Sequence, residues 1–80
     1  MASNPVIEAR KETGLSRVEL AQDSGLGYAR IAAAEAGYSS TIGKTIINTL
    51  SRRGIDTSGL EDAYRKWRYE QTKDIRGGSR

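Results

Sequence analysis

Residues 16–37, SRVELAQDSGLGYARIAAAEAG, constrain the fold of this chain more than any other stretch, because they contain two helix starts and an enforced turn. Ser16 precedes Glu19 by three residues, so its hydroxyl can accept from a first-turn amide while the carboxylate reaches back to the cap. Gly25 follows this short helix, at a place where a left-handed residue ends a helix at little cost. The pattern predicts that one helix ends and another begins almost at once.

The second helix of this stretch is expected over residues 28–36, which are rich in alanine and contain no glycine or proline. Ile31 and Ala34 lie three residues apart and share one face, and Gly37 ends the segment. Two helices joined by a turn of about three or four residues are the arrangement that holds a recognition helix in the major groove of DNA. The same spacing also suits a helical hairpin in any small bundle, so the pattern alone leaves both interpretations open.

The composition limits the chemistry of the chain. Its 80 residues suffice for one domain with a single small core. It contains no cysteine and no histidine, which excludes disulfides, thiolate or imidazole metal ligands and the commonest general base. We therefore expect no catalytic residue, metal or cofactor, and a protein that is not an enzyme. Without an apolar run of about 18 residues or a signal-peptide pattern, we expect a soluble, cytoplasmic protein without a membrane partner.

Positive charge is concentrated at the C-terminal end. The net charge is +3, and residues 65–80 contain six basic and two acidic side chains. The preceding 64 residues are therefore close to neutral. A basic end fits a nucleic-acid partner, but charge runs are also common on solvated helix faces.

A first helix is expected from Pro5 to Thr13. Asn4 can cap it, Pro5 suits its first position, and Gly14 can end it. Arg10 lies on its apolar stripe, where an unpaired charge would cost several kcal/mol. Arg10 must therefore have an acidic partner elsewhere in the chain.

A fourth helix should follow a polar loop over residues 38–43. Ser40 or Thr41 can cap it, and it should run to about Arg53, with Gly54 closing it. Its isoleucines and leucine recur at helical spacing, which indicates a face packed into the core.

The last helix is expected over residues 59–74, with Ser58 and Glu61 as its capping box. An apolar and aromatic stripe along it includes Tyr64 and Trp67. This stripe either packs in the core or forms a dimer surface with Trp67 as its anchor. We expect the domain to end near residue 74 and residues 75–80 to form a flexible tail or linker.

The segment RKETGLSRVELAQDSGL, residues 10–26, resembles the first half of the Cro and phage-repressor type (lambda-repressor-like, Xre-type) of helix-turn-helix DNA-binding domain. Ile31, Glu35 and Gly37 then fall where that family has its core isoleucine, the acid that ends its recognition helix and the following glycine. In this family an arginine of the first helix pairs with that acid, which implies an ion pair between Arg10 and Glu35.

The resemblance implies an all-α fold, a compact five-helix domain with its helix-turn-helix at residues 16–37. It also implies a sequence-specific transcriptional regulator, repressor or Cro-like, that acts in a bacterial host at the nucleoid. Its partner would be a double-stranded DNA operator bound as a homodimer, with half-sites about one helical turn apart and no small-molecule ligand. The positions that it assigns to base contacts are Tyr28, Ala29, Arg30 and Ala33. Those assigned to the DNA backbone are Ser16, Arg17, Ser39, Ser40, Thr41 and Lys44.

The expected base-contacting face departs from the family in one respect. It is dominated by alanine, which can touch a thymine methyl but offers no hydrogen bond to a base edge. Gly27 also replaces the usual capping serine or threonine. An alternative interpretation is therefore a protein-interaction module, such as an antitoxin or a phage adaptor, that keeps the fold.

Overall fold

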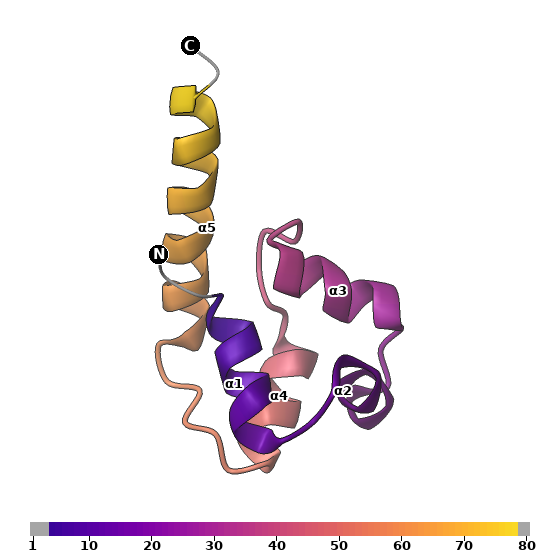
Figure 1. The fold of residues 1–80 in the computed structure, drawn as a ribbon. Coiled ribbons are helices and arrows are strands. Elements are labelled where there is room, and N and C mark those ends of the chain that lie inside the picture. The colour runs from indigo at the N-terminus through magenta and orange to yellow at the C-terminus, as the bar shows by residue number, and fades with distance from the viewer. Residues whose placement is uncertain (1–3, 79–80) are drawn as a thin grey trace.

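The structure, a computed structural model, describes the backbone of residues 4–78 and the side chains of residues 4–71. This part of the chain is all-helical and contains no strand. Figure 1 shows its five helices, which are α1 (Pro5–Thr13), α2 (Arg17–Ser24), α3 (Tyr28–Ala36), α4 (Lys44–Arg52) and α5 (Leu60–Gly78).

The first three helices begin and end as the sequence predicts. The Asn4 side chain accepts from the amide of Val6, and Ser16 and Glu19 form a complete capping box at the start of α2. Each of the three helices then ends at a left-handed glycine, with φ of 79°, 76° and 86° in chain order. These glycines are Gly14, Gly25 and Gly37.

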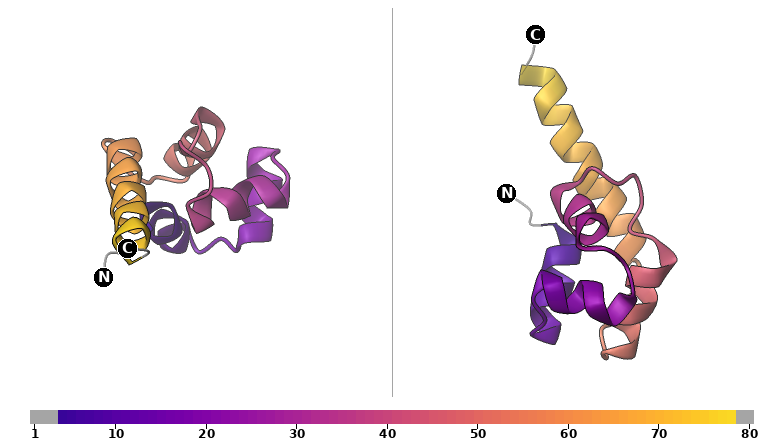
Figure 2. Two further views of the ribbon diagram at one scale, coloured as in Figure 1. Left: turned by 90° about the horizontal axis from the view of Figure 1, so that it is seen from above. Right: turned by 90° about the vertical axis from the view of Figure 1, so that its right-hand side faces the viewer.

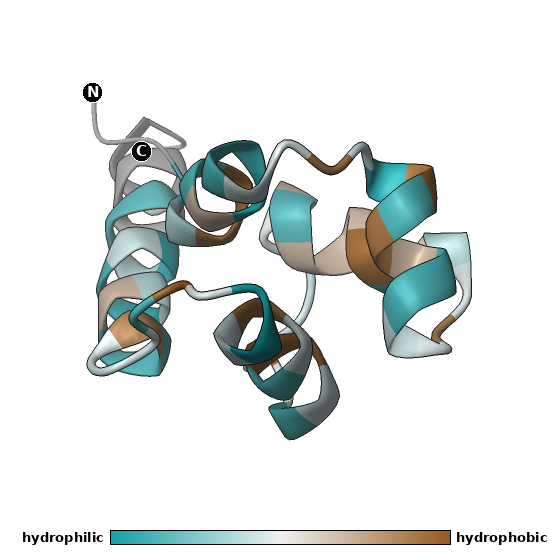
Figure 3. Ribbon diagram, turned by 90° about the horizontal axis from the view of Figure 1, so that it is seen from below, coloured by the Kyte–Doolittle hydropathy of each residue, from teal (hydrophilic) through white to brown (hydrophobic). Residues whose placement is uncertain are grey.

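A single apolar core lies between the helices. The view from below shows the apolar segments of α1, α2 and α4 turned toward the space that the helices enclose (Figure 3). Tyr64 of α5 completes this core and is fully buried. The other buried apolar residues are Val6, Ala9, Leu20, Ala21, Ile31, Ala34, Ile42, Ile46 and Leu50.

Helix α4 follows the loop over residues 38–43, as the sequence predicts, but the predicted cap is wrong. Its N-cap is Gly43, with a φ of 95°, so Ser40 and Thr41 do not cap it. The reason is Ile42, which is fully buried and must enter the core before the chain can turn into the helix. Glycine allows that turn because it adopts a positive φ without steric cost.

The predicted capping box of the last helix is wrong, because the Glu61 carboxylate is engaged elsewhere. It accepts a hydrogen bond from the backbone amide of Ile42 at 3.0 Å, which ties α5 to the segment before α4. The helix itself begins at Leu60.

Helix α5 also continues beyond its expected end. It runs to Gly78, because no glycine or proline interrupts the chain between residues 60 and 76. Residues 75–78 of the predicted tail are therefore helical, and residues 1–3 and 79–80 lie outside the described part. The later turns of α5 project past the other helices, as Figure 1 and the right view of Figure 2 show. Within the described residues, no helix combines the length and apolar character needed to cross a membrane.

Candidate nucleic-acid interface

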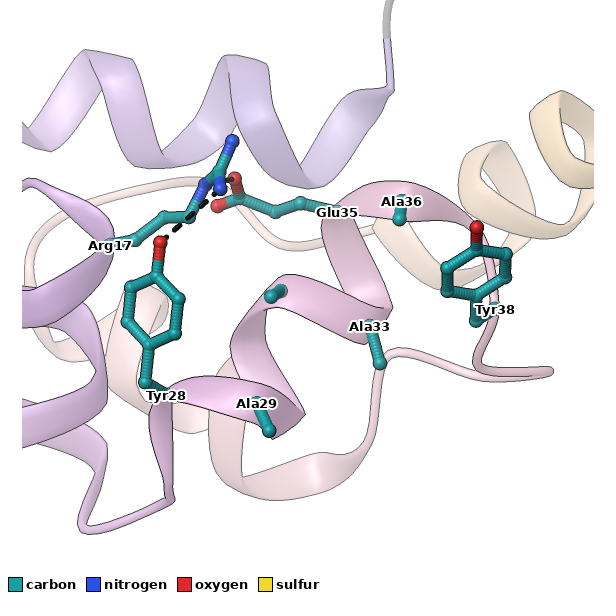
Figure 4. A pocket seen from close by; sticks show the side chains of 8 residues that line it. Arg17, Tyr28, Ala29, Ala33, Glu35, Ala36 and Tyr38 are labelled. Carbon is teal, nitrogen blue, oxygen red and sulfur yellow. Dashed lines mark hydrogen bonds and ion pairs between the residues drawn. The ribbon is translucent and has the colours of Figure 1, made fainter.

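The outward face of α3 forms a shallow hollow of about 520 Å³ (Figure 4). Its floor consists of small side chains, and the two tyrosines near its ends, Tyr28 and Tyr38, are 48% and 83% exposed. Arg17 and Glu35 form one edge of the hollow. The alanines that line it are Ala29, Ala32, Ala33 and Ala36.

Glu35 connects the first three helices through its carboxylate. Its side chain is only 1% exposed, and Arg10 approaches it with Nε 2.6 Å from Oε2 and Nη2 3.4 Å from Oε1. Arg17 adds a third contact, with Nε 2.9 Å from Oε1. The structure thus provides the acidic partner that Arg10 requires, and it adds a second arginine that the sequence did not indicate.

The two arginines on Glu35 lie in different surroundings. The Arg10 side chain is 14% exposed and also donates from Nη1 to the carbonyl of Leu15. The Arg17 side chain is 45% exposed. A buried carboxylate needs a charged partner. Arg10 is the more deeply buried of the two arginines, so we assign it the structural role of neutralising Glu35. Arg17 remains open to solvent and to ligands.

Arg17 also contacts the first residue of α3. Its Nη1 donates to the hydroxyl of Tyr28 at 3.3 Å. The hydrogen bond to Tyr28 and then the contact with Glu35 raise the pKa of Arg17 above its usual value. Both groups therefore favour the charged guanidinium at the edge of the hollow.

Arg30, one of the expected base contacts, points away from the alanine face. Its Nη1 donates to Ser39 Oγ at 2.7 Å, and its Nη2 lies so close to Gly43 that a Cβ there would be 3.0 Å away. Arg30 is therefore grouped with the expected DNA-backbone residues of the loop before α4. The other members of this group, all exposed, are Ser40, Thr41 and Lys44.

Ser16, the first of the expected backbone contacts, is exposed at the start of α2. Its hydroxyl accepts from the amide of Glu19 at 3.1 Å, so the side chain caps the helix. An anion that approaches this end would meet the other amides of the first turn and the positive end of the helix dipole.

Asn4 connects the start of α1 to the end of α3. Besides capping α1, its Nδ2 donates to the carbonyls of Ala34 and Glu35 at 3.1 and 2.8 Å, and the residue is only 3% exposed. The last carbonyls of a helix have no partner within the helix, so Asn4 supplies one. The sequence indicated only the capping role, since the carbonyls lie 30 residues away.

Helix α5 holds the same end of α3. The Tyr64 hydroxyl lies 3.0 Å from the carbonyl of Ala34 and 2.8 Å from that of Ser39, to which it donates, and Arg68 Nε donates to the carbonyl of Gly37 at 2.9 Å. Because Tyr64 is fully buried within one chain, its assignment to a dimer surface is wrong. The hydroxyl needs partners in the interior, and the end of α3 provides them.

Trp67 is partly buried against the core, and its ring centroid lies 6.0 Å from that of Tyr64. A Cβ at Gly37 would approach the Trp67 ring to 2.9 Å, so the indole packs directly on the backbone at the end of α3.

Among the described residues, no group of acidic side chains is arranged to hold a metal ion. Comparison of the chain with protein-family models, curated proteins and solved structures gives no match.

Proposed function

We propose that this protein is a sequence-specific DNA-binding regulator of the lambda-repressor-like type, with α3 in the major groove of its operator. The observation that carries the proposal is the outward face of α3, which follows α2 after a turn of three residues and is left open by the rest of the fold. In a helix-turn-helix, the second helix occupies the groove while the first lies across the backbone.

The width of the major groove and the small side chains on the outward face of α3 support this placement. The major groove is about 12 Å wide and admits a helix. Because the centre of the α3 face consists of Ala29, Ala32 and Ala33, the helix backbone can approach the bases more closely than with long side chains. Alanine methyls can then contact thymine methyls.

Cationic and hydroxyl side chains surround this face where phosphates would run. Arg17 lies at one edge of the hollow, and Arg30, with Ser39, lies at the loop that follows α3. Phosphate contacts of this kind fix the register of a protein on the duplex, and base contacts supply the specificity. With few donors directed at the bases, DNA shape would supply a larger share of the specificity.

The test is a selection from random duplexes, followed by titration of the best sequence at several salt concentrations. We expect a two-fold symmetric consensus and affinity that falls with salt by a log-log slope of about 0.9 per phosphate neutralised. Arg17→Ala should lower all affinities together and reduce this slope by about one.

Arg53→Ala is the matched control for Arg17→Ala. Arg53 is also 45% exposed and also places its Nε 2.9 Å from a carboxylate, that of Asp23, but it does not line the hollow. We expect it to leave the affinity and the slope unchanged. Equal losses from both variants would show a general charge effect, and no consensus would contradict the proposal.

A second function is favoured by the same apolar floor. A surface of alanines between two exposed tyrosines also suits a protein helix, as in an antitoxin or a phage adaptor. That function predicts duplex binding without a consensus, or none at all, and a protein partner whose binding depends only weakly on salt.

A further inference from the structure

The Tyr28 hydroxyl is directed at Arg17. We propose that Tyr28 is a positioning residue, which holds the Arg17 guanidinium for a DNA phosphate, and that it does not read a base. This inference rests on the proposed function and replaces the role that the resemblance gives to Tyr28.

The geometry assigns separate parts of the guanidinium to separate partners. Glu35 Oε1 accepts from Nε at 2.9 Å, and the Tyr28 hydroxyl accepts from Nη1 at 3.3 Å. A guanidinium has five N–H groups in a rigid plane, so two contacts from different residues fix the orientation of that plane. The N–H groups that remain on Nη1 and Nη2 suit the oxygens of a phosphate.

The charges allow Arg17 to take an anion without disturbing the interior. Glu35 keeps its contacts with Arg10, which is nearly buried and already satisfies the carboxylate. The three groups together carry one net positive charge, and Arg17 is the member that is 45% exposed. A phosphate would therefore compete with Glu35 for Arg17 only, and the ion pair between Glu35 and Arg10 would stay in place.

The direction of the Tyr28 side chain argues against a base contact. In Figure 4 its hydroxyl points toward Arg17, at the start of α2, while Ala29 and Ala33 lie along the helix away from that hydroxyl. Tyr28 therefore spans the junction of α2 and α3, where the DNA backbone would pass. The side chains directed at the bases are then the alanines.

A double-mutant cycle in DNA binding tests the inference, with the full chain and the selected duplex. Tyr28→Phe removes the hydroxyl and keeps the ring. We expect a loss of affinity of about three- to tenfold, because the hydrogen bond to a charged group is lost at a partly exposed site. The loss should be equal on the selected duplex and on random duplexes, and the selected consensus should stay the same.

In the Arg17→Ala background, Tyr28→Phe should have no further effect, since there is no guanidinium left to orient. Tyr69→Phe is the matched control, because Tyr69 is also exposed and does not line the hollow. We expect it to leave the affinity for the selected and the random duplexes unchanged. Thermal unfolding of each variant verifies that the fold is intact.

Three results would overturn the inference while leaving the proposed function in place. These are a changed consensus at one base pair, an equal loss in the Arg17→Ala background, and no loss from Tyr28→Phe. Failure of the wild-type chain to select any DNA would instead overturn the proposed function together with the inference.

Discussion

The two ends of helix α3 are held in very different ways. At its C-terminal end, Asn4 and Tyr64 hydrogen-bond to the last carbonyls, and Glu35 is paired with Arg10. At its N-terminal end, the N-cap is Gly27, which provides no side-chain hydrogen bond. Tyr28, the first residue of α3, accepts a hydrogen bond there from Arg17.

This difference indicates which end of α3 fixes the orientation of the helix. The C-terminal end is fastened to α1 and α5, so the body of the protein sets the direction of α3. The N-terminal end borders the junction with α2, where Gly25, Gly27 and Tyr28 are exposed and no side chain caps the helix. On the proposed function, the end that meets the DNA is therefore the more exposed of the two.

The largest effect is expected at the fastened end. Glu35→Leu should lower the free energy of unfolding by about 3 to 5 kcal/mol, because it leaves the nearly buried Arg10 without its partner. Arg10→Met should be similarly costly, and the double variant should recover much of the loss. Urea unfolding measures each value. Simple additivity in this cycle would show that the two residues are not coupled.

A smaller effect is expected for Tyr64→Phe, at about 1 to 2 kcal/mol at neutral pH, because the carbonyls of Ala34 and Ser39 lose the hydroxyl. Burial, the largest cause, raises the pKa of Tyr64 above its ordinary value near 10. The unfolded chain then loses this proton first as the pH rises, so stability falls above about pH 10.

The Phe variant lacks this titration. Its deficit relative to the wild type should therefore shrink between pH 9 and about pH 11, as urea unfolding at both values can measure. A constant deficit would show that the Tyr64 hydroxyl does not titrate differently in the folded state.

The smallest effect is expected at the loosely held end. Gly27→Ser should stabilise the protein by a few tenths of a kcal/mol, because serine can cap α3 and a Cβ there would meet no atom within 4 Å. Gly27 has extended backbone angles that any residue can adopt. Thermal unfolding is the measurement, and a loss of stability would show that this end is more constrained than its contacts indicate.

The local features of the sequence predicted the first three helices well. Asn4, Ser16 and Gly25 lie within a few residues of the amides and turns that they control, so sequence spacing determines their roles. The prediction failed where a distant residue competed. Glu61 has the spacing of a capping box, but its carboxylate bonds to the amide of Ile42 from another part of the chain.

The candidate site was predicted less completely than the helices. The alanine face and the acidic partner of Arg10 could be anticipated, the second with the help of the family resemblance. The direction of Arg30 toward Ser39 and of Tyr28 toward Arg17 could not, because long side chains have several rotamers and their partners lie on other elements.

The sequence by itself determined where the first helices start and stop and that α3 has an apolar face and an alanine face. These are properties of short spacing and of backbone preference. Only the tertiary structure decided that Asn4, Tyr64 and Arg68 fasten one end of α3, that Tyr64 belongs to the core, and that Arg17 shares Glu35 with Arg10. Those contacts join residues 18 to 31 positions apart, so they exist only once packing has brought their helices together.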